Sequence, residues 1–240
     1  MAKKLRLDKV LSNIGCGSRA EIKKYCKYGK ITVNGKVANN PGLQVDPEND
    51  EILFDGQAVK YREFVYIMLN KPDGYISATF DKRDPIVLDL IDPSYLAFDP
   101  FPVGRLDKDT EGLLILTNDG QLSHRVLSPK KHVPKTYYAK IDGVVTEEDI
   151  VAFEKGVTLD DGYETMPSQL KILKSEEISE IELTIHEGKF HQVKRMFESV
   201  GKKVVYLKRL SMGKLKLDES LALGECRELT EEEIRLMEER

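Results

Sequence analysis

The chain has 240 residues, of which 40% are hydrophobic and 32% are charged. This balance excludes disordered and collagen-like chains and allows a sizeable core in one or two domains. The 37 Lys and Arg residues against 41 Asp and Glu residues give a formal net charge of −4, which taken alone argues against a nucleic-acid partner. No apolar run reaches the roughly 18 residues of a membrane helix, and no signal-peptide pattern opens the chain. Three widely separated cysteines form neither a zinc pattern nor a disulfide framework, so we expect a cytoplasmic protein.

The small net charge conceals two basic segments. Residues 1–36 hold ten Lys and Arg against two Asp and Glu, and residues 189–216 hold nine against Glu198 alone. Residues 218–240 reverse this balance, with nine acidic residues against three arginines. A single basic segment usually marks a solvated helix face. Because a phosphate backbone responds to local potential, two such segments favour a polyanionic partner modestly.

The first sixty residues predict two short helices and a hairpin. The first helix is indicated by one apolar stripe at positions i, i+3, i+4 and i+7: Leu7, Val10, Leu11 and Ile14. Ser18 and Glu21 form a capping box that begins a second helix, which should end at Gly29. Residues 31–38 read as a hairpin around an Asn-Gly turn, and residues 51–56 add a strand and a turn.

This amino-terminal segment, LRLDKVLSNIGCGSRAEIKKYCKYGKITVNGK, resembles an S4 RNA-binding domain, and the match extends over about residues 5–58. In that family the two helices and the loop that follows contact structured RNA. The resemblance therefore implies an RNA-binding patch made of five basic side chains: Arg6, Lys9, Arg19, Lys23 and Lys27. We expect residues 1–60 to form this domain.

The remaining chain alternates strands with a few helices. Residues 57–63 read as a linker, and strands are expected at 64–69, 112–117, 135–141 and 181–185. Thr146 and Asp149 cap a short helix that should end near Gly156. The absence of regular βαβ alternation predicts an α+β fold with a mixed, largely antiparallel sheet. The chain has no G-x-G-x-x-G, no Walker A motif and no paired metal-ligand spacing, so we expect no cofactor and no metal.

A helix is predicted over residues 188–201, with Gly201 as its end. Its apolar stripe would be formed by Phe190, Val193, Phe197 and Val200. His191, Lys194 and Arg195 would share a different face, because they lie at i, i+3 and i+4. Such a helix can present a fixed cation to an acidic group.

Three carboxylates crowd into the turn before the strand at 112–117: Asp107, Asp109 and Glu111. From these residues alone, a solvated acidic loop is the simplest interpretation. A glycosidase is a second interpretation, because two carboxylates can divide the acid and nucleophile roles. The chain contains no tryptophan to form a sugar platform, which weakens that interpretation.

The segment GRLDKDTEGLLILTNDG resembles the signature of pseudouridine synthases of the RsuA-like branch. Three further segments match in order: YIMLNKPDGYISATFD, KTYYAKI and EGKFHQVKRMFESVGKKVVYLKRLSMG. Within the branch, SHRVLSPKKHVPKTY and GECRELTEEEI are most similar to the enzyme for 16S ribosomal RNA. The resemblance implies isomerisation of one uridine, uridine 516 in standard 16S numbering. A 23S enzyme of the same branch and an inactive ribosome-assembly protein are the alternatives.

The resemblance also implies roles for individual residues. Asp107 would be the catalytic carboxylate, and Tyr137 the aromatic residue that stacks on the target base. Lys194 would be the cation beside the carboxylate, with Arg195 as the second candidate and as an RNA contact. Arg105 would hold the flipped nucleotide or fill its gap.

Other residues near these motifs have simpler interpretations. Asp109 is expected to be structural and to form the turn. Tyr137 and Tyr138 should point to opposite faces of their strand, so only one can enter a cleft. We expect residues 61–240 to form the catalytic domain of a monomeric enzyme that binds ribosomal RNA and no membrane.

Overall fold

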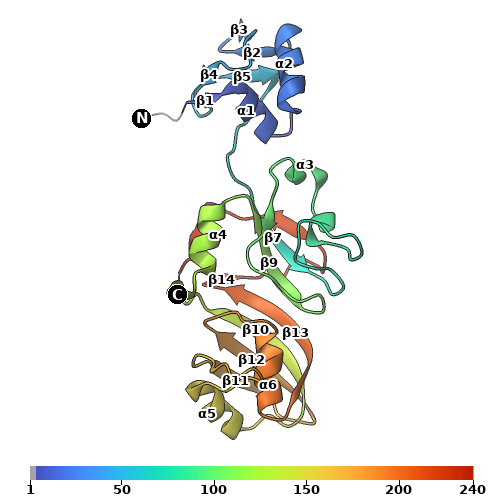
Figure 1. Ribbon diagram of the computed structural model, residues 1–240, viewed down its shortest axis with the longest axis vertical. Helices are drawn as coiled ribbons and strands as arrows, with labels where there is room; N and C mark the ends of the chain where they lie inside the picture. Colours follow the sequence, from blue (N-terminus) through green and yellow to red (C-terminus); the bar gives the residue numbers. More distant parts are fainter. Residues whose placement is uncertain (1–3, 240) are drawn as a thin grey trace. The chain divides into compact units, whose positions relative to one another are not determined.

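The computed structural model describes residues 4–239, which divide into two compact units. One unit extends to Val65 and also includes Asp92–Pro100. The other contains Tyr66–Ile91 and the chain from Phe101 onward (Figure 1). No helix within residues 4–239 is long and apolar enough to cross a membrane.

The first unit packs two helices, α1 (Leu7–Asn13) and α2 (Arg19–Lys27), against short strands. Its four-stranded sheet has the order β3-β2-β5-β6 and is formed by β2 (Ile31–Val33), β3 (Lys36–Val37), β5 (Ile52–Phe54) and β6 (Gln57–Ala58). A separate pair joins β1 (Leu5–Arg6) to β4 (Gln44–Val45). The segment Asp92–Pro100 carries the short α3 (Pro93–Leu96). One core holds the unit together: Leu7, Val10, Leu11, Ile22, Cys26, Ile31, Val33, Ala38, Val45 and Ile52.

Local sequence signals explain both ends of α2. The Ser18 hydroxyl accepts a hydrogen bond from the Glu21 N–H at 3.3 Å, and the Glu21 carboxylate accepts one from the Ser18 N–H at 2.8 Å. This confirms the predicted capping box. The helix ends at Lys27, two residues before Gly29, whose φ is 67°.

The two hairpins of the first unit are built on two-residue turns. Asn34 and Gly35 have φ of 51° and 73°, which confirms the predicted Asn-Gly turn between β2 and β3. Asp55 and Gly56 have φ of 52° and 81° and make a second turn of this kind. The chain therefore folds back, and Gln57–Ala58 pairs with β5. The prediction that this part of 57–63 is linker was wrong, because the turn continues the sheet.

The second unit is built on a nine-stranded sheet with the central order β11-β12-β10-β13-β9-β7-β15. Its strands are β7 (Tyr66–Lys71), β8 (Phe101–Pro102), β9 (Glu111–Thr117), β10 (Lys135–Asp142), β11 (Gln169–Lys174), β12 (Ile178–Ile185), β13 (Lys203–Met212), β14 (Leu215–Lys216) and β15 (Cys226–Glu228). The pairing of β13 with β9 is parallel, and the other pairings are antiparallel. The predicted α+β fold with a mixed, largely antiparallel sheet is confirmed.

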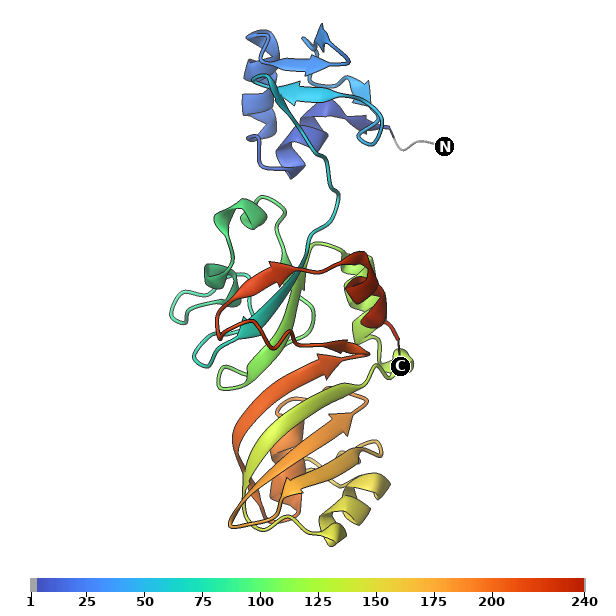
Figure 2. The ribbon, with the colours of Figure 1, turned by 180° about the vertical axis from the view of Figure 1, so that it is seen from behind.

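Helices cover different parts of this sheet. They are α4 (Gly120–Leu127), α5 (Glu147–Lys155), α6 (Gln192–Ser199) and α7 (Glu231–Leu236), with 3-10 turns at Val87–Leu90 and Pro129–Lys131. In Figure 1, α5 and α6 lie on one face of the strands β10 to β13, and Figure 2 shows the opposite face. The rings of Phe153 and Phe197 join α5 to α6 with centroids 5.0 Å apart. Farther along the sheet, α4 and α7 lie side by side (Figure 2), and the Arg125–Glu238 ion pair of 2.7 Å links their chain segments.

The bounds of several elements differ from prediction; the strand expected at 181–185, for example, begins at Ile178. The strand expected at 64–69 begins at Tyr66 and continues to Lys71. The helix expected at 188–201 begins only at Gln192, because His191 has a left-handed φ of 48°. Phe190 therefore lies outside the helix and is 75% exposed, so it does not join the predicted apolar stripe.

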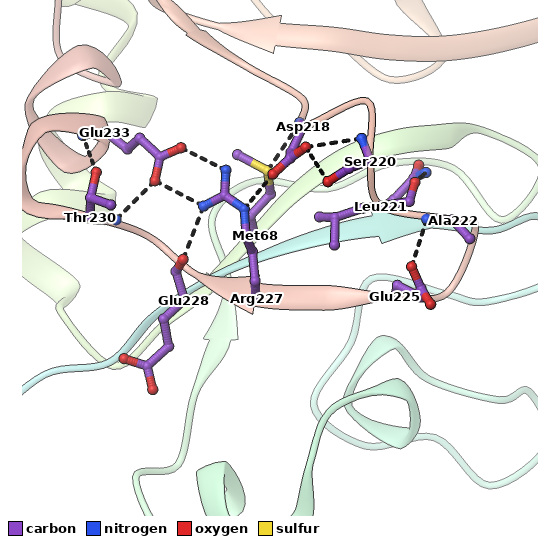
Figure 3. A network of polar contacts seen from close by, with 11 residues as sticks. Met68, Asp218, Ser220, Leu221, Ala222, Glu225, Arg227, Glu228, Thr230 and Glu233 are labelled. Carbon is purple, nitrogen blue, oxygen red and sulfur yellow. Dashed lines mark hydrogen bonds and ion pairs between the residues drawn. The ribbon is translucent and has the colours of Figure 1, made fainter.

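The carboxyl-terminal segment is fastened to the sheet through Arg227 on β15 (Figure 3). Its Nε donates to Asp218 at 2.6 Å, and its Nη1 and Nη2 donate to Glu233 at 2.9 and 2.7 Å. Hydrogen bonds from Ser220 and then Arg227 lower the pKa of Asp218 to about 2. Arg227 lowers the pKa of Glu233 to about 2 as well. Two of the acidic residues in the tail are thus neutralised by an arginine of the same segment.

We expect Arg227→Met to lower the melting temperature by about 3–6 °C at pH 7, because two carboxylates lose their shared partner. Both carboxylates titrate at lower pH in the folded chain than in the unfolded chain. Their contribution to stability is therefore present above about pH 4 and is lost as the pH falls toward 2. Thermal unfolding measures this at pH 7 and pH 3. The melting temperatures of Arg227→Met and wild type should differ less at pH 3 than at pH 7.

The matched control is Arg235→Met, because Arg235 lies in the same tail with a 73% exposed side chain and only a 3.6 Å contact to Glu231. It should change the melting temperature by about 1 °C or less. If the melting temperatures of Arg227→Met and wild type differ equally at both pH values, the role of the two carboxylates is contradicted.

Candidate active site

Asp107 lies in the loop between β8 and β9, and a close backbone contact fixes the far end of that loop. Gly112 has a φ of 98°, and a Cβ there would lie 2.3 Å from the carbonyl oxygen of Arg209. In the parallel pairing of β13 with β9, Arg209 is opposite Gly112 and Lys208 is opposite Glu111. Both the positive φ and the contact require glycine. The last glycine of GRLDKDTEG is therefore explained by the approach of β13.

The segment that follows β7 holds the other side of the loop. The Ser77 hydroxyl accepts a hydrogen bond from the Leu106 N–H and donates one to the Leu106 carbonyl, both at 3.0 Å. The Gly74 N–H donates to the carbonyl of Lys108 at 3.0 Å. The motif YIMLNKPDGYISATFD thus holds the backbone immediately before and after Asp107.

Lys71 is a buried cation beneath this loop that we did not predict. The side chain is fully buried, and its Nζ donates to the carbonyls of Pro72, Lys108 and Thr110 at 3.0, 3.0 and 2.8 Å. Burial lowers its pKa to about 8, against the opposing effect of nearby carboxylates that include Asp107. The only sequence signal is a lysine at the end of a run of buried strand residues, directly before a proline.

The structure brings Asp107 together with two basic side chains. Lys194 Nζ lies 3.4 Å from one carboxylate oxygen of Asp107, and His191 Nε2 lies 3.5 Å from the other. The Asp107 side chain is 28% exposed and that of Lys194 is 19% exposed, so the pair is only partly accessible. An ammonium at this distance stabilises the negative charge that a nucleophile or a base requires.

Asp109 is the nearer partner of Lys194. Lys194 Nζ donates to both of its carboxylate oxygens, at 2.6 and 2.8 Å. Burial raises the pKa of Asp109, but the hydrogen bond and charge of Lys194 outweigh that effect and hold the pKa below its usual value. Asp109 lies in a turn, as expected, closed by the hydrogen bond from the Thr110 N–H to the Asp107 carbonyl at 3.1 Å. In addition, Asp107 and Asp109 share one ammonium, which we did not predict.

Arg195 points to a different loop from its neighbour Lys194. Its Nε donates to Asp160 at 2.6 Å, and its Nη2 lies 2.7 Å from Asp161. Of the two adjacent candidates, Lys194 is the one that contacts Asp107. An RNA contact by Arg195 stays a prediction.

Tyr137 lies on the buried face of β10 and is 8% exposed. Tyr138 lies on the opposite face and donates to Glu180 at 2.6 Å, which confirms the predicted alternation. Tyr137 is opposite Arg209 of β13, which is in turn opposite Gly112 of β9. At about 4.8 Å per strand, this register places Tyr137 roughly 10 Å from the end of the Asp107 loop.

Two further buried cations flank Tyr137. Lys135 lies two residues earlier on the same face, and burial and then the charge of Arg209 lower its pKa to about 8. Arg209 is 2% exposed, and its Nε donates to the Leu113 carbonyl at 2.7 Å. The interior next to Tyr137 is therefore electropositive, which suits a polyanionic substrate.

The remaining predicted site residues lie at the surface. Arg105 is exposed in the Asp107 loop. In the first unit, Arg6 pairs with Asp8 at 2.7 Å, and the other members of the predicted RNA-binding patch are all exposed: Lys9, Arg19, Lys23 and Lys27. Within residues 4–239, no group of three or more His, Cys, Asp or Glu side chains is placed to hold a metal ion.

Comparisons with known proteins agree with this arrangement. The family described as RNA pseudouridylate synthase matches residues 65–199, and the S4 domain family matches residues 5–52. A solved structure described as a crystal structure of pseudouridylate synthase superimposes with a TM-score of 0.68 at 39% identity. The match covers 97% of this chain and 99% of that one.

Curated relatives match along nearly their whole length. The chain is 53% identical to an uncharacterized RNA pseudouridine synthase, YtzG, of Bacillus subtilis (strain 168), over 98% of this chain and 99% of that protein. It is 41% identical to ribosomal large subunit pseudouridine synthase B of the same organism, over 96% and 94% of the two chains. It is 40% identical to ribosomal small subunit pseudouridine synthase A of Escherichia coli (strain K12), over 96% and 98%. The chain belongs to the RNA pseudouridine synthase family and carries an S4 domain at its amino terminus.

Proposed function

We propose that this protein isomerises one uridine of 16S ribosomal RNA to pseudouridine, at uridine 516 in standard 16S numbering. The small-subunit and large-subunit synthases are similarly related to the chain, so the choice of subunit rests on the segments SHRVLSPKKHVPKTY and GECRELTEEEI. The protein acts as a cytoplasmic monomer on the RNA or on a small-subunit assembly intermediate.

The observation that carries this proposal is the Asp107 carboxylate, held beside Lys194 at 3.4 Å on a loop fixed at both sides. The isomerisation breaks the C1′–N1 bond of uridine, turns the base and joins C5 to C1′. C5 then loses its proton to solvent and N1 gains one, so there is no net redox change. Asp107 acts on the ribose, and the ammonium of Lys194, 3.4 Å away, orients the carboxylate.

The uridine must leave its stack to reach Asp107, which costs a few kcal/mol. Stacking on Tyr137 recovers part of that free energy. Arg105, exposed in the same loop as Asp107, holds the flipped nucleotide. Arg195 contacts the RNA backbone nearby.

The division of labour follows the sequence: residues 1–60 bind structured RNA and residues 61–240 carry the chemistry. We expect replacement of Lys9, Arg19, Lys23 and Lys27 by Gln to weaken binding of ribosomal RNA at least about tenfold. The slope of log affinity against log salt should become shallower by about 3 if these side chains contact phosphates. Filter binding between 50 and 200 mM salt measures both quantities. All four positions are exposed, so the fold should be retained.

The matched control replaces four exposed lysines of the second unit by Gln: Lys140, Lys155, Lys171 and Lys174. This variant removes the same charge from elements away from Asp107. Equal losses of affinity and slope in the two variants would show that only net charge matters, and would remove the S4 patch from recognition.

Tritium release from 5-tritiated uridine in 16S and 23S transcripts tests the function itself. We expect release corresponding to one uridine per 16S molecule and none from 23S. Release from 23S alone would assign the enzyme to the large subunit. If tritium is released from neither RNA, even when small-subunit particles are supplied, the protein lacks the proposed activity and acts only by binding RNA.

A further inference from the structure

Phe190 is an exposed aromatic side chain next to the candidate active site. It is 75% exposed, the highest value of any large hydrophobic residue that the structure describes. The ring stacks on the His191 imidazole, with centroids 3.8 Å apart and planes inclined by 19°. His191 Nε2 in turn lies 3.5 Å from the Asp107 carboxylate. The Phe190 ring is therefore only two contacts away from the carboxylate.

The loop that carries Phe190 is held by specific hydrogen bonds. The buried amide of Gln192 accepts from the Lys189 N–H and donates to the Glu187 carboxylate, both at 2.8 Å. Arg195 Nη1 donates to the carbonyl of Phe190 at 3.3 Å. Because the loop is fixed in this way, the exposed position of the ring is a defined feature of the fold.

The backbone next to the ring adopts a left-handed conformation, which is uncommon for residues other than glycine. His191 has φ of 48° and ψ of 32°, in the left-handed region. Such conformations persist where the surroundings over-determine them, and they cluster at functional sites. Here the conformation ends the loop, starts α6 and places Phe190 outside the helix with its ring on His191.

The chemistry around the ring favours a nucleobase as its partner. Lys189 and Lys194 are the nearest cations in sequence, and Lys189 Nζ lies 4.3 Å from the centre of the Tyr163 ring. An exposed aromatic face beside a lysine suits a nucleotide, because the ring can stack on the base while the positive charge attracts its phosphate. Flipping a uridine out of its stack also leaves the neighbouring base with one uncovered face.

We propose that Phe190 stacks on the nucleobase adjacent to the target uridine and replaces the stacking partner that this base loses on flipping. The inference rests on the proposed function, because it takes RNA as the substrate. It assigns Phe190 to substrate binding, with His191 as the side chain that orients the ring.

The test uses the full-length protein and the ribosomal RNA from which wild type releases tritium. Phe190→Leu keeps an apolar side chain but removes the ring, and Phe190→Tyr keeps the ring. We expect kcat/KM to fall about tenfold or more in Phe190→Leu, mainly through KM, and to be largely rescued in Phe190→Tyr. Since the side chain is exposed, both variants should melt within about 1 °C of wild type.

A second measurement reports stacking itself. 2-Aminopurine is placed on the 5′ or the 3′ side of the mapped target uridine, where stacking quenches its fluorescence. Wild type and Phe190→Tyr should quench one of the two positions, and Phe190→Leu should not. Equal kcat/KM and equal quenching in wild type and Phe190→Leu would overturn the inference while leaving the proposed function intact. Absence of tritium release by wild type from either RNA would overturn both.

Discussion

Asp107→Asn should abolish pseudouridine formation, with tritium release falling by about four orders of magnitude or more. The amide keeps the shape of the side chain but has no negative charge, so it can neither attack the ribose nor abstract a proton from it. RNA binding should be nearly unchanged, because Asp107 is a single partly buried side chain and the predicted RNA-binding patch lies in the other unit. Single-turnover tritium release and filter binding on the same preparation separate the two effects.

Two further variants are compared in the same assays, one as a control and one to test the shared ammonium. Asp142→Asn changes an exposed carboxylate at the end of β10 and should alter the rate by less than about twofold. Asp109→Asn loosens the ammonium that Asp109 shares with Asp107, and should reduce kcat about tenfold. Substantial activity in Asp107→Asn would exclude a catalytic role for this carboxylate.

Lys71→Met should be the second most damaging substitution. Methionine fills a similar volume, but the carbonyls of Pro72, Lys108 and Thr110 lose their buried donor. We expect the free energy of unfolding to fall by about 3 kcal/mol, because buried acceptors without partners are costly. We also expect kcat to fall by about a hundredfold, since the loop that carries Asp107 loses the buried ammonium that contacts it at Lys108 and Thr110.

Denaturant unfolding and tritium release, both at a temperature where the variant is folded, measure the two losses for Lys71→Met. Lys140→Met serves as the control, because Lys140 is exposed on the same sheet and should change stability by about 0.5 kcal/mol or less. Wild-type activity in a folded Lys71→Met protein would show that the three carbonyl contacts do not position Asp107.

The elements that could be predicted are those with local signals. The capping boxes of α2 and α5 place polar side chains three residues apart, and the Asn34-Gly35 turn needs only two residues. By contrast, the segment Asn118-Asp119-Gly120 has the composition of a turn, although Asp119 caps α4 by accepting from the N–H groups of Gln121 and Leu122. The same residue type serves both turns and helix starts, so sequence does not distinguish them.

The central strand β13 was not predicted because its partners are distant in sequence. It pairs with β10 and, in parallel, with β9, which starts more than ninety residues earlier. Its charged residues suggest a surface segment, yet Arg209 is buried and donates to the Leu113 carbonyl. Sequence rules place Lys and Arg outside, so buried cations such as Lys71 and Arg209 become visible only in the fold.

The site was predicted in part. Family resemblance named Asp107 and Lys194, and the structure brings them within 3.4 Å of each other although 87 positions separate them. It gave no indication that Asp109 competes for Lys194 or that His191 also contacts Asp107. Both depend on the left-handed backbone at His191 and on how the 103–110 loop is held, and neither feature has a local sequence signal.

The structure explains how a chain with an acidic tail can still bind RNA. Several of the nine acidic residues at 218–240 form ion pairs within the protein: Glu233 with Arg227, Glu238 with Arg125, and Glu239 with Lys214. Those carboxylates are neutralised locally and repel a phosphate backbone less than the net charge of −4 suggests.

The most direct test maps pseudouridines in ribosomal RNA by carbodiimide treatment and primer extension, in cells that lack this protein. One stop in 16S RNA should disappear, return when the wild-type gene is supplied, and stay absent with Asp107→Asn. Persistence of every 16S stop without the protein, or restoration of the missing stop by Asp107→Asn, would contradict the proposal that Asp107 isomerises a 16S uridine.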